Sequence, residues 1–342
     1  MKIKRKELLS ALGMVEPGLS SKLILEQSDC FVFHRGLVVT FNDEIMASAR
    51  CDIGCDAVVG SADFRKVVSK FPDDELDIVQ RKGELVVKGD RRSAGHLCSA
   101  EIHLPIDAVP APPKKSWSPI GEGIADILRQ AADACGSDES QNLSTMVSVT
   151  PGRIEACDNY RLFRYDGDHG FQNPVLIPAA SVRAISGRGL STVAMGEGWV
   201  YFKTDAGAVY SVRCSHEPYH EGTDKLLELD GGERVRMPAE LGGIIDRALV
   251  MNESGFDSNI TVGLSDGELM IHARKDAGWF RERRTIKYQG RSLTFAINPR
   301  FFIEVLERTH TVYVTDQKMK ITVGPIQFVL SLPVINTEEE GA

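Results

Sequence analysis

Apolar residues with helical spacing recur three times along this chain, at nearly even intervals. In each case they occupy positions i, i+3, i+4 and i+7, which places them on one face of a helix. The three segments are 8–15, 124–131 and 241–248. One amphipathic helix is ordinary in any soluble protein, but the regular interval predicts a repeated unit.

A second helical pattern follows each of the first ones, directly after a short apolar segment that predicts a strand. Its three copies cover residues 64–71, 182–185 and 302–309. The middle copy is shorter, because Gly187 and Gly189 have the backbone freedom that ends a helix. The two helical patterns keep a common interval across the chain, which strengthens the prediction of a repeat.

Strand patterns joined by turn residues come after each second helix. They lie at 76–79 and 84–87, at 192–195 and 199–202, and at 311–314 and 319–323. Each unit reads helix, strands, helix, strands, which predicts an α+β fold of three similar tandem domains. We place these domains at residues 1–113, 114–230 and 231–342. The proline-rich segment 110–115 and the polar segment 221–233 would connect them, and we expect both to be exposed.

Composition and charge agree with a folded protein and exclude some partners. Hydrophobic residues make up 42% and charged residues 26% of the 342 residues, as in globular domains. The formal net charge of −8 argues against a protein that holds nucleic acid through its overall charge. No apolar run approaches the about 20 residues that span a bilayer, and the N-terminus lacks a secretory signal. We therefore expect no membrane contact and a cytoplasmic location.

The chain offers little catalytic chemistry. Its seven cysteines lack the spacing of a disulfide framework, so we expect reduced, mostly buried thiols. The phosphate-binding loop GxxxxGK[ST] and the nucleophile elbow GxSxG are absent, and we predict neither enzyme activity nor a cofactor. A metal-dependent enzyme remains an alternative, because His216 and His220, or Cys51 and Cys55, could approach one ion. Stoichiometric zinc in the purified protein would support it.

Three segments of the chain match the motifs of one family. Residues 154–162 read Ile-Glu-Ala-Cys-Asp-Asn-Tyr-Arg-Leu, residues 175–178 read Val-Leu-Ile-Pro, and residues 329–335 read Val-Leu-Ser-Leu-Pro-Val-Ile. A weaker match lies at 104–110. On these residues the chain resembles, over essentially its full length, the β subunits of bacterial DNA polymerase III, which are sliding clamps.

The resemblance implies a DNA clamp fold, in which two chains form a head-to-tail homodimeric ring with antiparallel sheets outside and helices around a central hole. Such a ring encircles duplex DNA without reading its sequence and tethers a DNA polymerase as a processivity factor. The other implied partners are an ATP-dependent clamp loader and further proteins that carry a clamp-binding motif. A closed ring stays on DNA because it surrounds the duplex, and tight binding is not needed. Weak, hydrated contacts from basic side chains are then enough to hold it, despite the negative net charge.

Basic residues on and near the predicted helices are the candidates for facing DNA. Lys22 matches a basic DNA-contacting position of the family, whereas Ser137, in the corresponding loop of the second domain, is uncharged. The alternative is that such charges only solvate a helix face, and Glu304 and Glu307 weaken the case on the last helix. The DNA-facing candidates are Lys6, Lys22, Arg65, Lys66, Lys70, Arg129, Arg183, Arg188, Arg247 and Arg300.

The resemblance also implies a pocket between the second and third domains that takes short linear peptides from partner proteins. An apolar cleft with a few polar groups suits aliphatic and aromatic anchors of a peptide. For Leu162 and Val329 alone, core packing is the simpler explanation. The matched residues are Leu143, Cys157, Asn159, Tyr160, Arg161, Leu162, Pro218, Val329, Leu332, Pro333, Val334 and Ile335.

Two features near this pocket depart from the family. Asn159 and Tyr160 replace the Gly-His that is usual in the family's loop, so the rim is bulkier and the preferred peptide can differ. The chain also continues beyond the family's usual end with residues 336–342, which include three glutamates at 338–340. This tail could screen acidic peptides or be disordered.

Ring closure implies that an edge of the first domain, at about residues 95–101, meets residues 249–251 of the third domain in the other chain. Three alternatives to a cellular replication clamp stay open. A phage- or plasmid-encoded clamp would serve its own polymerase. A clamp-fold adaptor of a mobile element would recruit transcription or repair partners in place of a replicase. A monomeric clamp-like module would bind partners without encircling DNA.

Overall fold

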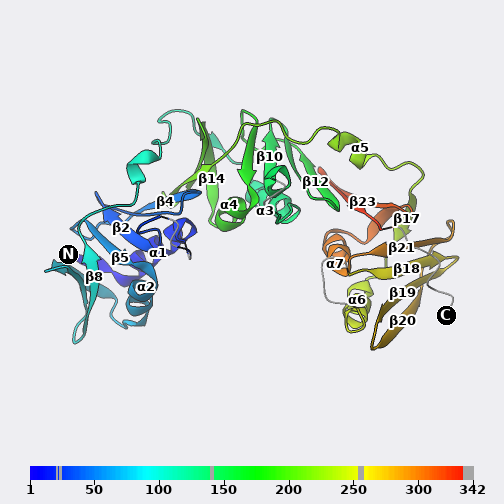
Figure 1. Ribbon diagram of the computed structural model, residues 1–342, viewed down its shortest axis with the longest axis horizontal. Coiled ribbons are helices and arrows are strands. Elements are labelled where there is room, and N and C mark those ends of the chain that lie inside the picture. The colour runs from blue at the N-terminus through cyan, green and yellow to red at the C-terminus, as the bar shows by residue number, and fades with distance from the viewer. Residues whose placement is uncertain (21, 23–24, 139–141, 253–257, 334–342) are drawn as a thin grey trace. The chain divides into compact units, whose positions relative to one another are not determined.

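The computed structural model describes residues 1–20, 22, 25–138, 142–252 and 258–333. Its strands pair antiparallel and its short helices pack against sheets, so the predicted α+β class is confirmed (Figure 1). The chain divides into two compact units. The first unit comprises Met1–Cys135, Thr145–Ile154 and Asp168–Tyr219, and the second comprises Gly136–Ser144, Glu155–Gly167 and His220–Ala342. The division into three domains stays a prediction.

A twelve-stranded sheet runs through the first unit. Within it β4 pairs with β16, so that Ala47 lies opposite Tyr210 and both are buried. The sheet order is β1 (Lys2–Lys4), β6 (Glu75–Arg81), β7 (Glu84–Lys88), β8 (Ser93–Ser99), β5 (Ala57–Gly60), β2 (Cys30–His34), β3 (Leu37–Phe41), β4 (Ile45–Arg50), β16 (Val209–Arg213), β15 (Trp199–Thr204), β14 (Leu190–Gly196) and β9 (Ser118–Pro119). The predicted hairpins of this unit, β6–β7 and β14–β15, are confirmed.

Four helices of the first unit bury one apolar face each, as their spacing predicts. Helix α1 packs on α2, and α3 packs on α4. Helix α4 is short, as predicted, and ends at Ser186 with Gly187 as its C-cap. The helices are α1 (Arg5–Val15), α2 (Ser61–Lys70), α3 (Ile124–Asp133) and α4 (Ala179–Ser186).

Shorter elements complete the first unit. Strand β10 (Met146–Thr150) pairs with β13 (Val175–Pro178), while β11 (Arg153–Cys157) carries residues of both units. Two 3-10 turns, η1 (Glu16–Gly18) and η2 (Ile106–Ala108), lie in the connections. In η1 a side chain at Gly18 would overlap the carbonyl oxygen of Thr40, so this close approach of backbones requires glycine.

Strands of two sheets make up most of the second unit. In the first set β12 pairs with β24, and Phe163 lies opposite Phe328 in the core. The first set has the order β12 (Arg161–Asp166), β24 (Ile326–Ser331), β23 (Lys318–Val323), β22 (Thr311–Val314) and β17 (Glu233–Arg236). The second is a four-stranded sheet with the order β20 (Gly278–Thr285), β19 (Glu268–Lys275), β18 (Ile260–Ser265) and β21 (Leu293–Ile297).

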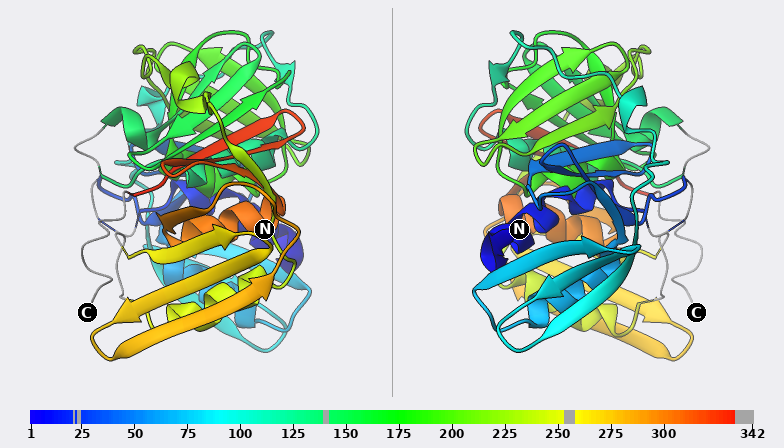
Figure 2. Two further views of the ribbon diagram at one scale, coloured as in Figure 1. Left: turned by 90° about the vertical axis from the view of Figure 1, so that its right-hand side faces the viewer. Right: turned by 90° about the vertical axis from the view of Figure 1, so that its left-hand side faces the viewer.

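Helices α6 (Leu241–Leu249) and α7 (Pro299–Arg308) cover one face of this four-stranded sheet, and its other face is open (Figure 2, left). Both lie where the helical patterns predict them. Helix α7 begins with Pro299 in its first turn, and the Asn298 side chain accepts a hydrogen bond from the backbone N–H of Arg300 at 2.9 Å. A further 3-10 turn, η3 (Asn142–Thr145), lies in the same unit except for its last residue.

The two predicted connecting segments differ in burial. Residues 110–115 are mostly exposed, as expected. The expectation that residues 221–233 are exposed is wrong in part, because they contain the short helix α5 (Thr223–Leu227), whose Thr223 and Leu227 are buried. A composition rich in glycine and acidic residues predicted a solvated segment, whereas side chains from distant strands hold this one in place.

Three cationic side chains of the second unit hold α5. The guanidinium group of Arg164 on β12 donates to the carboxylate of Asp224 at 2.5 Å and to the hydroxyl of Thr223 at 3.0 Å. Lys320 on β23 donates to the carbonyl oxygen of Leu227 at 2.7 Å, and Lys318 lies near two further carbonyls. Donors to the last carbonyls of a helix supply the partners that its own backbone lacks there.

Candidate functional site

The loop between β11 and β12 is a tight turn built by Asp158. Its carboxylate accepts hydrogen bonds from the backbone N–H groups of Tyr160, at 2.8 Å, and Arg161, at 2.9 Å. The backbone N–H of Asp158 in turn donates to the carbonyl of Arg161 at 3.0 Å. An aspartate that bonds its own backbone in this way fixes a turn. The turn leaves Asn159 exposed and Tyr160 half-buried.

The side chain of Arg161 ties this turn to helix α7. This side chain is 8% exposed, and its guanidinium group donates to Asp158 at 3.1 Å and to both carboxylate oxygens of Glu304 at 2.9 and 3.1 Å. The same group lies 4.5 Å from the centre of the Phe301 ring. A buried cation is tolerated when it is paired and hydrogen-bonded, as this one is. The arrangement therefore fixes the position of the loop.

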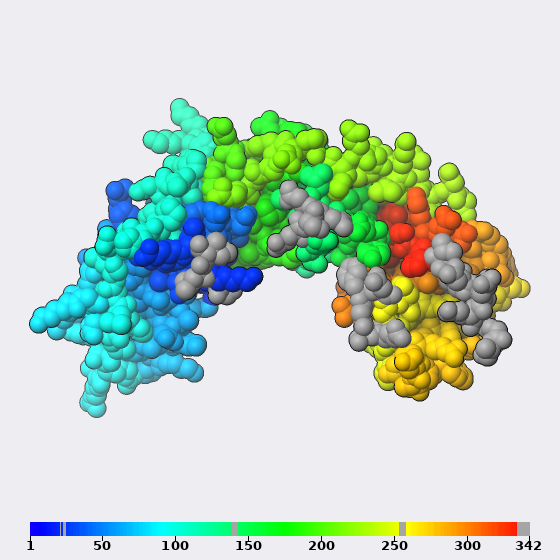
Figure 3. Space-filling model, in the orientation of Figure 1, coloured from blue at the N-terminus to red at the C-terminus, as the bar shows by residue number. Residues whose placement is uncertain are grey.

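Tyr160 completes this cluster, with its ring centre 6.4 Å from that of Phe301. Its carbonyl oxygen accepts a hydrogen bond from the backbone N–H of Ser331 at 2.7 Å, which joins the loop to the end of β24. Next to it Leu162 lies opposite Val329, and Leu332 is also buried. Two of the three segments with the family motifs thus meet side by side in the second unit, where green and red atoms adjoin (Figure 3).

A cavity of about 200 Å³ opens beside the loop. This volume is below the about 300 Å³ at which small-molecule sites begin, so it suits one or two side chains better than a whole ligand. Polar side chains are among its lining residues, and the hydroxyl of Ser144 lies 3.5 Å from the imidazole of His220. The lining residues are Gly136, Ser137, Asp138, Ser144, Asp158, Asn159 and Tyr160.

The structure accounts for the predicted pocket residues in three ways. Tyr160, Arg161, Leu162, Val329 and Leu332 come together around the loop and the end of β24, and Pro333 follows as an exposed residue. Leu143 on η3 is half-buried, Cys157 at the end of β11 is buried, and Pro218 belongs to the first unit. Val334, Ile335 and the acidic tail lie outside the described residues.

Sequence reasoning missed the residues that hold the loop from behind. Asp158 stands within the matched motif and could have been recognised as a turn-forming residue. Phe301 and Glu304 carry no local signal, because they lie on a helix more than a hundred residues away and differ in no visible way from other helix residues. The sequence presented Glu304 as a charge that weakens DNA contact, whereas in the structure it is the ion-pair partner of Arg161.

All the residues predicted to face DNA are exposed. Most lie on helices α1, α2, α3, α4, α6 and α7, whereas Arg188 follows α4 and Lys22 follows η1. Several of these side chains form ion pairs with a carboxylate of their own unit. Arg183 pairs with Asp133 at 3.3 Å, and Arg247 pairs with Glu282 at 2.8 Å.

Glu16 in η1 holds two of the candidates at once. It pairs with Arg65 of α2 and with Arg188, the latter at 3.6 Å, and Arg188 also donates to the carbonyl of Gly13 at 2.8 Å. A carboxylate shared between two guanidinium groups reduces the local positive charge. In the described part of the chain, the candidates without a carboxylate within ion-pair distance are Lys6, Lys22, Lys66, Lys70 and Arg300.

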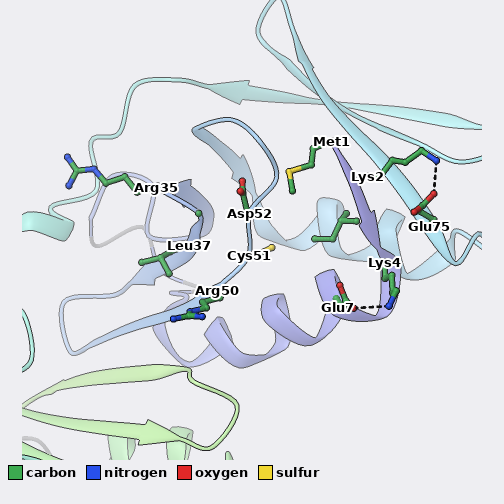
Figure 4. Close-up of a pocket in the computed structure, with 12 residues that line it drawn as sticks. Met1, Lys2, Lys4, Glu7, Arg35, Leu37, Arg50, Cys51, Asp52 and Glu75 are labelled. Atoms are coloured by element: carbon green, nitrogen blue, oxygen red, sulfur yellow. Dashed lines mark hydrogen bonds and ion pairs between the residues drawn. The ribbon is translucent and has the colours of Figure 1, made fainter.

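A larger cavity of about 650 Å³ lies beside strand β1 in the first unit, and none of the predicted site residues lines it (Figure 4). Its ionic residues carry both signs. Lys2 pairs with Glu75 at 2.8 Å and Lys4 with Glu7 at 3.4 Å. Neighbouring carboxylates match the two lysines, whereas Arg35 and Arg50 add further positive charge to the lining.

The seven cysteines, all in the described part of the chain, are thiols and not disulfides, and three of them are buried. Burial raises the pKa of Cys30 and of Cys51 to about 12 and that of Cys214 to about 11, so these thiols stay protonated and poorly nucleophilic at neutral pH. Among the described residues, no group of three or more His, Cys, Asp or Glu could hold a metal ion. No helix in the described part of the chain is long and apolar enough to cross a membrane.

Solved structures with a closely similar fold are sliding clamps. The DNA polymerase III β chain of Streptococcus pneumoniae gives a TM-score of 0.84 at 17% sequence identity, covering 98% of this chain and 99% of that one. The DNA polymerase sliding clamp of Bacillus subtilis gives 0.83 at 15% identity, covering 98% of each chain. The clamp of Pseudomonas aeruginosa bound to griselimycin gives 0.79 at 16% identity, covering 98% and 99%. No protein-family model and no curated protein sequence matches this chain. The chain has the sliding-clamp fold.

Proposed function

We propose that this chain is a processivity factor, a head-to-tail homodimeric ring that encircles duplex DNA and tethers a DNA polymerase. The observation that carries the proposal is the clamp fold, which the chain shares over 98% of its length with clamps from several bacteria. Each protomer would contribute three domains, at residues 1–113, 114–230 and 231–342. The protein would act in the cytoplasm by holding its partners together, without catalysis of its own.

The distribution of charge supports a ring that slides. The candidates for facing DNA are exposed on helices, but Glu16, Asp133 and Glu282 hold several of them in ion pairs. Basic side chains that are already paired would make only weak contacts with DNA phosphates. Such contacts would release few counterions from the DNA, so they would add little affinity and would not slow movement along it. A net charge of −8 is compatible with DNA binding only if a closed ring supplies retention.

The turn at Asp158 to Arg161 supports a peptide site. Half-buried Tyr160 supplies aromatic surface and packs near the buried ring of Phe301, and the paired guanidinium group of Arg161 lies against that ring. A rigid rim costs little conformational entropy when a peptide binds. We infer that an aliphatic or aromatic anchor of a partner peptide contacts this surface. The partners would be the polymerase, the clamp loader and other proteins that carry such a motif.

Retention on DNA of different topology tests the ring. Protein diluted until it dissociates is mixed with nicked circular DNA and then concentrated, so that rings close around the DNA. We expect the protein to stay bound through a wash at high salt and to be lost after a single cut linearises the DNA, because a closed ring leaves only at free ends. Equal loss from circular and linear DNA would contradict the proposal.

Substitution of Tyr160 tests the pocket. We expect Tyr160→Ala to weaken binding of labelled polymerase peptides about tenfold, since a buried aromatic contact contributes on the order of 1 kcal/mol beyond its area. Fluorescence anisotropy measures the change, and Tyr313→Ala on β22 serves as the control. Peptides are taken from bacterial and from mobile-element polymerases. Binding of transcription or repair peptides alone would instead support the adaptor of a mobile element.

A further inference from the structure

A free strand edge runs along the cavity of about 650 Å³ beside β1 (Figure 4). In the described part of the chain β1 ends its sheet and pairs with β6 alone. The carbonyl oxygen of Met1 accepts a hydrogen bond from the N–H of Ile78 at 2.9 Å, and the N–H of Arg5 donates to the residue before β6 at 2.8 Å. Antiparallel pairing turns the backbone groups of the alternate residues away from the partner strand. The N–H and C=O of Lys2 and the N–H of Lys4 therefore face away from β6.

The cavity lies on this free side of the edge. Figure 4 shows Cys51 and Asp52 on the side of β1 opposite to Glu75 of β6. Ile3 and Leu37 give the lining apolar surface, and Leu37 is 37% exposed. The volume is within the range of binding sites, about 300–1,000 Å³, and suits several residues of an extended chain. The space beside β1 can thus take a further strand.

Two guanidinium groups make one side of this cavity positive. Arg35 and Arg50 are exposed, and neither has a carboxylate within ion-pair distance among the residues that the structure describes. The nearby carboxylate of Asp52 is engaged, because it accepts a hydrogen bond from the backbone N–H of Gly54 at 2.8 Å. The two lysine–glutamate pairs of the lining are exposed, and such pairs rearrange at little cost. An acidic group that enters the cavity would therefore meet unpaired arginines.

The backbone that carries these arginines is fixed. Arg35 and Gly36 form the two-residue turn between β2 and β3, with φ of 51° and 77°. The carboxylate of Asp56 holds this turn by accepting a hydrogen bond from the N–H of Arg35 at 3.1 Å. Arg50 lies opposite Leu37 in the pairing of β3 with β4. Only side chains would have to be ordered by a ligand, which keeps the entropic cost of binding low.

We propose that the free edge of β1 binds an extended acidic segment of a partner protein, which pairs with β1 as an added strand and places carboxylates on Arg35 and Arg50. An added strand gains affinity from main-chain hydrogen bonds and specificity from the side chains beside them. The site lies in the first unit and shares no residue with the loop around Tyr160 in the second. It is a second docking site, and it does not depend on the proposed ring.

An extended peptide matches this site better than a small anion. The main-chain groups of β1 form a row of donors and acceptors that only another strand can satisfy together. Among the described residues that line the cavity none is aromatic, so a nucleotide base would find no ring to stack on. The unpaired arginines then select acidic side chains in the added strand.

Binding of a labelled pentapeptide tests the proposal. In this probe glutamate alternates with valine, so that its carboxylates share one face of a strand. We expect saturable binding to the full chain in fluorescence anisotropy, with an affinity that falls as salt is raised. The same peptide with lysine in place of glutamate should not bind. Lack of saturable binding up to millimolar concentrations of the acidic peptide would overturn the proposal.

Charge reversal at the two arginines tests their contacts. We expect Arg35→Glu combined with Arg50→Glu to weaken binding about 100-fold, since each lost charge-assisted hydrogen bond costs about tenfold in affinity. Arg81→Glu combined with Arg91→Glu is the matched control, because both arginines are exposed and lie outside the cavity. Circular dichroism checks the fold of both double variants. An equal loss in the two would mean that only the overall charge attracts the peptide.

Proline at position 2 tests strand pairing. Lys2→Pro removes an N–H that β6 does not use, so it should weaken binding about threefold to tenfold relative to Lys2→Ala, which keeps the N–H. Hydrogen exchange at Ile78, whose N–H bonds to Met1, checks that β1 stays paired in both variants.

Peptides with methylated backbone nitrogens test the same pairing on the unaltered protein. Two such peptides carry methyl groups on alternate sets of nitrogens. One set should abolish binding and the other should not, because only one edge of the added strand faces β1. Equal binding of both methylated peptides would mean that the cavity takes anions without strand pairing, and the proposal would be wrong.

Tyr160→Ala distinguishes this site from the proposed polymerase pocket. The variant should bind the acidic pentapeptide as tightly as the unaltered protein does, whether or not the protein forms a ring. Loss of binding in Tyr160→Ala would place the peptide at the loop of the second unit and would overturn its assignment to β1.

Discussion

Replacing Arg164 with methionine is expected to lower the free energy of unfolding by about 3–5 kcal/mol. The side chain of Arg164 is 4% exposed and pairs with that of Glu155, which is 6% exposed. Methionine would fill much of the same space but leave the Glu155 carboxylate buried without its partner. It would also remove the partner of Asp224 and Thr223, and so one of the three cationic side chains that hold helix α5. Denaturant unfolding followed by circular dichroism measures the loss.

A second variant separates the charge from the packing. Arg164→Met combined with Glu155→Leu removes both members of the buried pair, and we expect it to recover most of the lost stability, since an apolar replacement of a buried ion pair is often neutral. Hydrogen exchange should still be faster at Thr223–Leu227, because α5 has lost one of its three cationic partners. Equal stability of the single and double variants would contradict this account.

Replacing Arg161 with alanine is expected to weaken peptide binding about 100-fold, the largest effect we expect at the pocket. Its side chain joins Asp158, Glu304 and Phe301, and an unpaired buried carboxylate is left behind when it is removed. The loop would lose its fixed position and would have to be ordered again by each peptide. Fluorescence anisotropy with the labelled polymerase peptides measures the change.

Two further variants define how Arg161 acts. Arg161→Lys keeps the charge but has one nitrogen where arginine uses two, Nε for Asp158 and Nη1 for Glu304, so it should restore only part of the binding. Arg300→Ala, on the same helix and exposed, is the matched control and should bind peptide normally. Normal binding by Arg161→Ala would mean that the loop needs no support from α7.

Local periodicity explains which parts of the fold the sequence could predict. The helices α1, α3 and α6 bury residues at the predicted spacing, because the residues that form one helix face lie close together in the sequence. Helix α5 escaped prediction because Arg164, Lys318 and Lys320, from distant strands, hold it. Its own sequence resembles a solvated connection.

In the candidate site, too, some residues could be predicted from local sequence and others could not. The motif segments that meet around Tyr160 could be found, because each is a continuous run that matches the family. The support from Phe301 and Glu304 could not, since only the folded chain brings α7 to the loop. The shared partner of Arg65 and Arg188 was hidden for the same reason, because nothing around Glu16 distinguishes it from other acidic residues.

The pairing of β4 with β16 also bears on how such a chain can diverge. Backbone N–H and C=O groups hold these strands together, and every residue except proline supplies both groups. A boundary made in this way places few demands on particular side chains, provided that alternation of buried and exposed positions is kept. Side chains along it can therefore be exchanged over evolutionary time while the backbone geometry persists. That tolerance explains how a TM-score of 0.84 coexists with 17% sequence identity.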